Sequence, residues 1–190
     1  MIDRRIKNIG ETLPTIRFTG APSSDYAGAS AVVTQHAGQR LPLPDACIDY
    51  VFTDPPFGSN LFYSDLNLLW ESWLGYLTDD TYEAVWNKSK KKAQGGKSVQ
   101  DYKDLMKDAF IEMRRVLKPK RWASVVFHNS DDKIWDAIRE AAEEAGFNIR
   151  NAQAFDKKQK TFKGIRGDKG LERVSNLDIV LNLYNPSTDG

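Results

Sequence analysis

An apolar, β-prone run that stops at two consecutive prolines constrains this chain most. Residues 47–53 are expected to form a strand, and the chain then continues as Asp54-Pro55-Pro56-Phe57-Gly58. Proline lacks the N–H that a central strand needs for its ladder, so the strand must end here. In open α/β sheets, ligands bind at the edge formed by the carboxyl ends of the strands. We therefore expect a rigid loop at that edge, presenting the Asp54 carboxylate, the Pro55 carbonyl and the Phe57 ring.

Composition limits the class of protein. The chain has 190 residues, of which 41% are hydrophobic and 28% charged, with a net charge of +1. These values predict a globular domain, and no apolar run approaches the roughly 20 residues of a membrane span. The N-terminus has no apolar segment after its charges, so we expect no signal peptide and a cytoplasmic protein. One cysteine and two histidines predict neither a disulfide framework nor a metal site.

Turn residues and apolar periodicity predict an α/β fold with alternating strands and helices. We expect a poorly patterned segment over 1–30 and a single catalytic domain over 31–186. Within them the patterns predict strands near 16–18, 31–34, 47–53, 123–127, 147–155 and 178–184, helices over 64–77, 98–117 and 131–145, and a short helix containing Tyr82, Val85 and Trp86.

Four further expectations concern caps and topology. Ser98 and Asp101 form a capping-box pattern, and Asn129 or Ser130 is expected to cap the helix after it. Strands that alternate with helices indicate a largely parallel sheet. The last two strands have no helix between them, so we expect them to form an antiparallel pair at the sheet edge.

The residues of the proline loop suit chemistry on an amino group. The lone pair of an exocyclic amino nitrogen is delocalised into its nucleobase, which makes the nitrogen a poor nucleophile. The Asp54 carboxylate and the Pro55 carbonyl, aimed at its two hydrogens, would free that lone pair for in-line attack on an activated methyl group. Phe57 offers a face on which an extruded base can stack.

This loop resembles the catalytic motif of S-adenosylmethionine-dependent amino-methyltransferases, the adenine-N6/cytosine-N4 DNA methylases. The similarity extends over most of the chain from about residue 40, through segments 41–45, 49–57, 60–73, 112–119, 122–130, 156–163 and 178–186. The resemblance implies a Rossmann-like sheet with helices on both faces and S-adenosylmethionine as cofactor. It also implies Asp54, Pro55, Pro56 and Phe57 as catalytic residues, with Asp54 and Gly58 beside the cofactor.

The resemblance implies a nucleic-acid substrate, DNA first, as in restriction-modification. Relatives that act on cytosine N4 usually carry Ser where this chain has Asp54, which favours adenine N6. An RNA methyltransferase forming N2-methylguanine and a cofactor-free nucleic-acid-binding remnant remain alternatives. The expected nucleic-acid contacts are Asn129 and the basic-segment residues Lys157, Lys158, Lys160, Phe162 and Lys163.

One departure from the family pattern concerns the cofactor. The family holds the methionine end of S-adenosylmethionine with a glycine-rich loop after the first strand, and no glycine pair of this chain follows a plausible first strand. We therefore expect the fold to be incomplete on its cofactor side. Self-association, or a partner that supplies the missing half, follows from the exposed sheet edge that this would leave.

Overall fold

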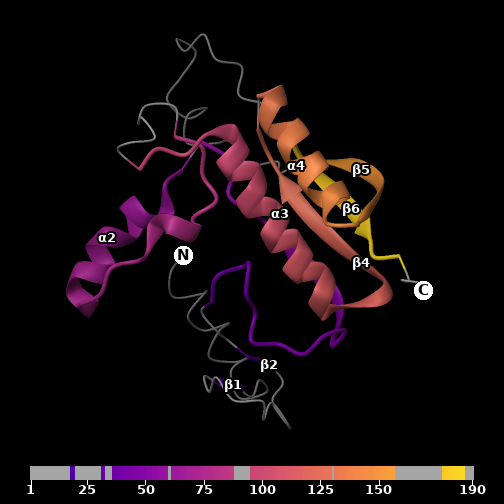
Figure 1. The fold of residues 1–190 in the computed structure, drawn as a ribbon, viewed down its shortest axis with the longest axis horizontal. Coiled ribbons are helices and arrows are strands. Elements are labelled where there is room, and N and C mark those ends of the chain that lie inside the picture. The colour runs from indigo at the N-terminus through magenta and orange to yellow at the C-terminus, as the bar shows by residue number, and fades with distance from the viewer. Residues whose placement is uncertain are drawn as a thin grey trace.

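The computed structural model describes residues 18–19, 31–32, 36–59, 61–87, 95–129, 131–156 and 177–186. The elements in order are β1 (Phe18–Thr19), β2 (Ala31–Val32), β3 (Ile48–Thr53), α2 (Tyr63–Leu74), the 3-10 helix η2 (Asp80–Tyr82), α3 (Val99–Val116), β4 (Leu117–Phe127), α4 (Asp132–Glu144), β5 (Asn148–Asp156) and β6 (Leu177–Tyr184) (Figure 1). No helix among these combines the length and apolar character needed to cross a membrane.

Four strands form one mixed sheet in the order β3-β4-β6-β5. Only β3 and β4 are parallel, while β6 runs antiparallel to both β4 and β5. The expectation of a largely parallel sheet is therefore wrong for this sheet, because β6 lies between β4 and β5 instead of extending a parallel series. The antiparallel pairing of the last two strands is confirmed, with β5 at the edge. Separately, β1 and β2 form a two-residue parallel pair.

Helices α3 and α4 pack together on one face of this sheet (Figure 1). The core between these layers is apolar and is formed by residues from both helices and from the inward positions of the strands: Tyr102, Met106, Phe110, Ala123, Val125, Phe127, Ile134, Ile138, Leu181 and Leu183. At the surface, Lys103 bridges to Glu140 and Glu144 at 2.6 and 2.7 Å and joins the two helices. The α/β class is confirmed; among the described residues, these two helices cover one face only.

The other face of the sheet carries a row of hydrogen-bonded polar side chains. The Tyr50 hydroxyl donates to Ser124 Oγ, Ser124 Oγ donates to Asn182 Oδ1, and Asn182 Nδ2 donates to Asn151 Oδ1, each at 2.7 Å. The row crosses all four strands. Ser124 is the buried member of this row, and its two hydrogen bonds satisfy a hydroxyl that would be costly to leave unpaired.

The starts and ends of the helices agree with the sequence patterns in some places and differ in others. The capping box of Ser98 and Asp101 is confirmed at the start of α3. Asp131, not Asn129 or Ser130, caps α4, because its side chain accepts from the Lys133 amide. Beyond η2, residues 83–87 are not helical, so the expected short helix is reduced to one turn.

Strand β4 is longer than expected because a bulge accommodates Pro119. Ile48 pairs with Leu117 and Tyr50 pairs with Trp122, so extra residues are inserted on β4 between these two positions. Lys120 within this insertion has φ +62°, outside the range of regular strands. The bulge lets the strand begin directly after α3 despite the proline.

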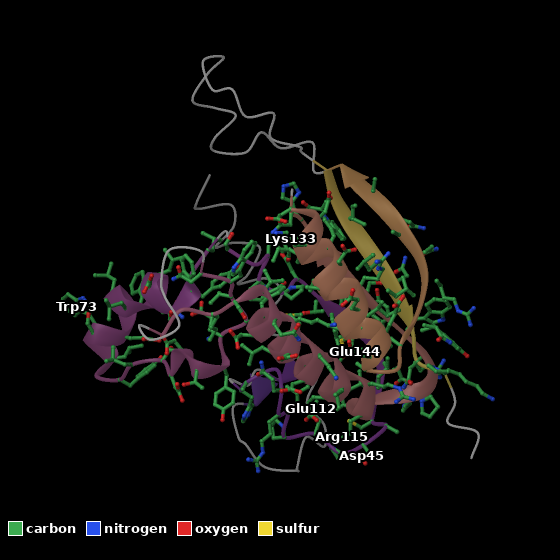
Figure 2. The ribbon with its side chains drawn as sticks, turned by 45° about the horizontal axis from the view of Figure 1, so that its top comes forward. Asp45, Trp73, Glu112, Arg115, Lys133 and Glu144 are labelled. Carbon is green, nitrogen blue, oxygen red and sulfur yellow. The ribbon has the colours of Figure 1, made fainter. Side chains whose placement is uncertain are left out.

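Arg115 near the end of α3 fixes the segment that leads into β3. Its guanidinium donates to the Leu43 carbonyl at 2.9 Å and to Glu112 at 2.7 Å, and it pairs with Asp45 (Figure 2). Glu112 in turn accepts from the Leu41 amide at 2.7 Å, and the hydrogen bond from Arg115 lowers the pKa of Glu112. This network sets where β3 starts, and therefore where it ends.

The division of the chain into a segment over 1–30 and a catalytic domain over 31–186 stays a prediction.

Candidate active site

The Asp-Pro-Pro-Phe loop (54–57) follows β3 at the edge where β4 also ends. Thr53 pairs with Val125 in parallel register, so both strands leave the sheet on the same side. Strand β6 runs in the opposite direction, and Ile179 near its start pairs with Phe127 near the end of β4. This edge therefore brings together the loop, the end of β4 and the start of β6.

Tyr102 of α3 holds the loop from the core side. Its hydroxyl donates to the Pro56 carbonyl at 2.8 Å, and the side chain is fully buried. Burial raises the pKa of the Tyr102 hydroxyl, so this group remains a neutral donor at physiological pH. Two successive prolines have no N–H to donate, so their carbonyls are the polar groups by which the protein can hold this part of the loop.

Asn129 holds the next carbonyl of the loop. Its Nδ2 donates to the Phe57 carbonyl at 2.6 Å, and its Oδ1 accepts from the Asp131 amide at 2.7 Å. The indole of Trp135 donates to the Asn129 carbonyl at 2.8 Å and fixes this residue in turn. In this structure Asn129 contacts the loop itself; its expected nucleic-acid contact stays a prediction.

Phe57 and Gly58 pack behind the loop. The Phe57 ring meets Phe127 edge to face at a centroid distance of 5.3 Å, and it lies 6.3 Å from the His128 ring. Gly58 is buried, and a Cβ at this position would lie 3.1 Å from Cδ1 of Ile134. With φ +77°, Gly58 also has a backbone conformation that side chains disfavour. A structural need for glycine is therefore evident here.

His128 connects the end of β4 to the start of β6. Its Nδ1 lies 3.3 Å from Oδ1 of Asp178, whose side chain is only 2% exposed. The pair places an ionisable cluster beside Phe57 at the same edge of the sheet. Neither His128 nor Asp178 is among the site residues expected from the sequence, because a long segment separates the two in the chain and only the fold brings them together.

A cavity of about 1070 Å³ opens beside the loop. Asp54, Pro55 and Pro56 line it, whereas Phe57 and Gly58 do not. Its apolar wall comes from β3 and α3, and its polar wall from α2 and the segment that follows: Val51, Met106, Phe110 and Met113, with Ser64, Asn67, Asp79 and Glu83. The exposed Asp54 carboxylate thus sits at the boundary between the sheet edge and a space large enough for a small-molecule ligand.

The basic segment that contains Lys157, Lys158, Lys160, Phe162 and Lys163 lies outside the described residues. Its two flanking positions are described. Asp156 at the end of β5 pairs with Leu177 at the start of β6. The chain therefore leaves and re-enters the sheet at the same edge as the loop.

The sequence of the chain matches that of a known family. The pattern that defines the family N6_N4_Mtase, described as DNA methylase, matches residues 48–182. The chain belongs to this family. This is the family that the resemblance of its Asp-Pro-Pro-Phe loop implied. None of the curated proteins compared with the chain matches it.

Solved structures of methylases are similar to this chain at low identity. A protein of Thermus thermophilus named as a DNA modification methylase, in complex with S-adenosyl-L-methionine, is 14% identical with a TM-score of 0.45, over 90% of this chain and 56% of that one. The cytosine-N4-specific PvuII DNA methyltransferase is 16% identical with a TM-score of 0.49, over 75% of this chain and 44% of that one. The chain spans about half the length of these structures.

The electrostatics of the cavity suit part of the cofactor. S-adenosylmethionine carries a positively charged sulfonium, and the described residues of the lining include the carboxylates of Asp54, Asp79 and Glu83 but no Lys or Arg. Hydrogen bonds from Thr81 lower the pKa of Asp79, which keeps it ionised. For the methionine end, Gly38 is the one glycine among the lining residues, so the described lining offers no glycine-rich loop. The fit extends to the charged centre of the cofactor and not to its methionine end.

Replacing Gly58 with alanine should destabilise the protein more than the same change at Gly75. The two glycines have nearly equal φ values, +77° and +79°, but a Cβ at Gly75 meets nothing within 4 Å. Both variants incur the cost of the left-handed conformation, about 1 kcal/mol. Only Gly58→Ala also presses on the buried Ile134, which adds roughly 1–3 kcal/mol. Urea unfolding of both variants measures the difference, and equal losses would contradict the close packing behind the loop.

Tyr102→Phe should lower the free energy of unfolding by about 1 kcal/mol at neutral pH, because the Pro56 carbonyl loses its donor. The folded-state pKa of Tyr102 is raised above its unfolded value. Its contribution is therefore present below about pH 10 and falls as the pH rises further, since only the unfolded chain then ionises. The stability gap between wild type and Tyr102→Phe should shrink at alkaline pH. Tyr82→Phe, at a tyrosine that is 57% exposed, is the control and should leave stability nearly unchanged.

Proposed function

We propose that this chain is the target-binding part of a methyltransferase that modifies the N6 amino group of adenine in DNA. The observation that supports this most is the arrangement of carbonyls in the loop. Those of Pro56 and Phe57 are occupied by Tyr102 and Asn129. Among the described residues, no hydrogen bond reaches the Pro55 carbonyl. Pro55 and Asp54 line the cavity together.

Two adjacent acceptors suit a primary amino group. In the proposed complex, the Asp54 carboxylate and the Pro55 carbonyl each accept one hydrogen of the adenine N6 group, and the nitrogen lone pair is released from the ring. When bound, S-adenosylmethionine supplies an activated methyl group. The residues of this chain orient the acceptor nitrogen, and the proton that it loses goes to solvent. Because the prolines and the two held carbonyls fix the loop, little reorganisation accompanies the reaction.

The half-buried Phe57 is proposed to stack on the extruded base, while its edge-to-face contact with Phe127 holds the ring in place. Lys157, Lys158, Lys160, Phe162 and Lys163 are proposed to contact the DNA around it. In support, Asp156 and Leu177, which flank this segment, lie at the sheet edge that also carries the loop. Phosphate contacts from lysines would position the duplex without reading its sequence.

The remaining part of the cofactor site is proposed to come from a further polypeptide body, on a partner or elsewhere in a longer chain, placed beside β3. Among the described strands of this sheet, β3 pairs only with β4, so its other edge is open. Tyr50 and Phe52 on this strand are 53% and 66% exposed. Open edges with exposed aromatic residues readily accept another strand.

The substrate is tested by the transfer of a labelled methyl group from S-adenosylmethionine to duplex DNA and to structured RNA, followed by analysis of the modified base. The proposal predicts N6-methyladenine in DNA. Detection of N4-methylcytosine in DNA, or of N2-methylguanine in RNA, would contradict adenine N6 as the target.

Calorimetry with S-adenosylmethionine tests whether the chain binds the cofactor by itself or needs a second polypeptide body to do so. We expect no measurable heat from the isolated chain, because its described cavity has no hold on the methionine end. Tight binding of the cofactor by the chain alone would contradict the proposed second body. An S-adenosylhomocysteine titration under the same conditions is the control for charge, since it lacks the sulfonium.

Asp54→Asn tests whether the Asp54 carboxylate binds the amino group, and the test does not require the cofactor. The probe is a duplex with one adenine opposite an abasic site, compared with N6,N6-dimethyladenine, which has no N6 hydrogen to donate. Wild type should prefer adenine by about tenfold or more, the equivalent of a hydrogen bond to a charged group at about 1.5–3 kcal/mol. Asp54→Asn should lose most of that preference.

Asp49→Asn is the matched control, because Asp49 is an exposed carboxylate of β3 that pairs with Lys118 at the far end of the strand. It should retain the preference for adenine. An unchanged preference in Asp54→Asn would show that another group recognises the base.

A further inference from the structure

Helix α2 exposes its apolar face to solvent. The outward positions of the helix carry large apolar side chains, which define the α2 apolar face: Leu66, Leu69, Trp70, Trp73 and Leu74. Trp70 is 70% exposed and Trp73 is 85% exposed. In Figure 2, Trp73 lies at the outer end of the helix, away from the rest of the molecule. We propose that this face is the contact by which two copies of the chain associate, independently of the methyl-transfer proposal.

Helix α2 turns its polar side toward the protein and its apolar side toward solvent, the opposite of an ordinary surface helix. Its inward side carries the polar residues Ser64, Asn67 and Glu71, at helical spacing, and the first two line the cavity. Glu71 is only 5% exposed. A surface helix normally turns its apolar stripe to the core. Here the polar side is fixed to the protein, so the apolar stripe is left for a partner.

Polar contacts hold the helix in this orientation. Glu83 accepts from the Tyr63 amide at 2.5 Å and from the Ser64 hydroxyl at 2.6 Å, which secures the first turn. At the other end, Glu71 accepts from the Thr78 amide at 2.9 Å. Because both ends are fixed, the face is already formed before any partner arrives, and association costs little conformational entropy.

The area of the α2 apolar face matches what an interface needs. With about 250 Å² per indole, the exposed fractions of Trp70 and Trp73 amount to about 390 Å². Three leucines, each more than half exposed, enlarge this area. The largest apolar patch of a typical monomer is about 300–600 Å², and one side of a stable interface buries about 800 Å². The two indoles alone lie within the first range, and the leucines bring the face closer to the second value.

Charge argues against nucleic acid as the occupant. Between Leu61 and Trp86 the chain carries five acidic residues, Asp65, Glu71, Asp79, Asp80 and Glu83, and no Lys, Arg or His. Phosphates would be repelled by this segment. The occupant must instead be an apolar protein surface.

A second copy presents such an apolar surface. In a two-fold interface the same face lies on both sides, so apolar residues meet apolar residues. Asp65 is the one exposed charged residue of α2. If two antiparallel helices cross near Trp70, the two Asp65 residues lie about 15 Å apart along the axis, beyond the Debye length of about 8–10 Å.

Sedimentation velocity of the full chain, over a wide range of concentrations, tests the proposal. Wild type should shift with concentration from the 21.5 kDa of one chain to twice that mass. Trp73→Glu should remain at the mass of one chain throughout. The control Ile111→Glu places the same charge at an apolar residue of α3 that is 46% exposed, and it should dimerise as wild type does.

Circular dichroism shows whether each variant is folded, and a charge at an 85% exposed position should not unfold the chain. A second variant, Leu69→Glu, repeats the test on the same face. A wild type that stays at the mass of one chain at all concentrations, or folded variants of α2 that still dimerise, would overturn the proposal. Retained base preference in the Trp73→Glu monomer would leave the proposed function intact, so the two can fail separately.

Discussion

Hydrogen bonds to two successive carbonyls fix the position of the loop that carries Asp54. Tyr102 holds Pro56 from helix α3, and Asn129 holds Phe57 from the end of β4. Both donors belong to the core layer, since Tyr102 is fully buried between α3 and the sheet, and Asn129 is itself held by Trp135. The loop therefore takes its geometry from the packed interior. Any change that loosens the contact of α3 with the sheet would also displace the Asp54 carboxylate.

The sequence predicted the elements that depend on local signals. Two prolines marked the end of β3, the capping box marked the start of α3, and the absence of a helix between the last strands indicated their antiparallel pairing. The position of β6 between β4 and β5 was not predictable in this way, because it depends on which distant strand offers the better partner. Its alternation of buried residues is compatible with either an edge or an interior place.

The role of Asn129 shows how tertiary contacts override a local preference. The sequence predicted Asn129 or Ser130 as the cap of α4, because both residue types favour that position. In the structure the Phe57 carbonyl takes the Asn129 amide, and Asp131 caps the helix. An aspartate cannot donate to a carbonyl while ionised, so only this division satisfies both the loop and the helix. Knowledge that the loop lies next to β4 is needed to predict it.

The two surfaces that this part of the chain leaves open differ in what they can recognise. The edge of β3 that no described strand covers offers backbone groups. These groups pair with almost any extended strand, so they do little to select one partner over another. The α2 apolar face offers indole and leucine side chains, which select a partner by shape. The cavity lies between them: Val51 of β3 lines it, and so do Ser64 and Asn67, which lie on the side of α2 opposite the apolar face. A body that covers the α2 apolar face therefore leaves the lining of the space beside Asp54 unchanged, whereas a strand added at β3 would lie next to a residue that lines it, so association through α2 and occupation of the cavity are physically separable.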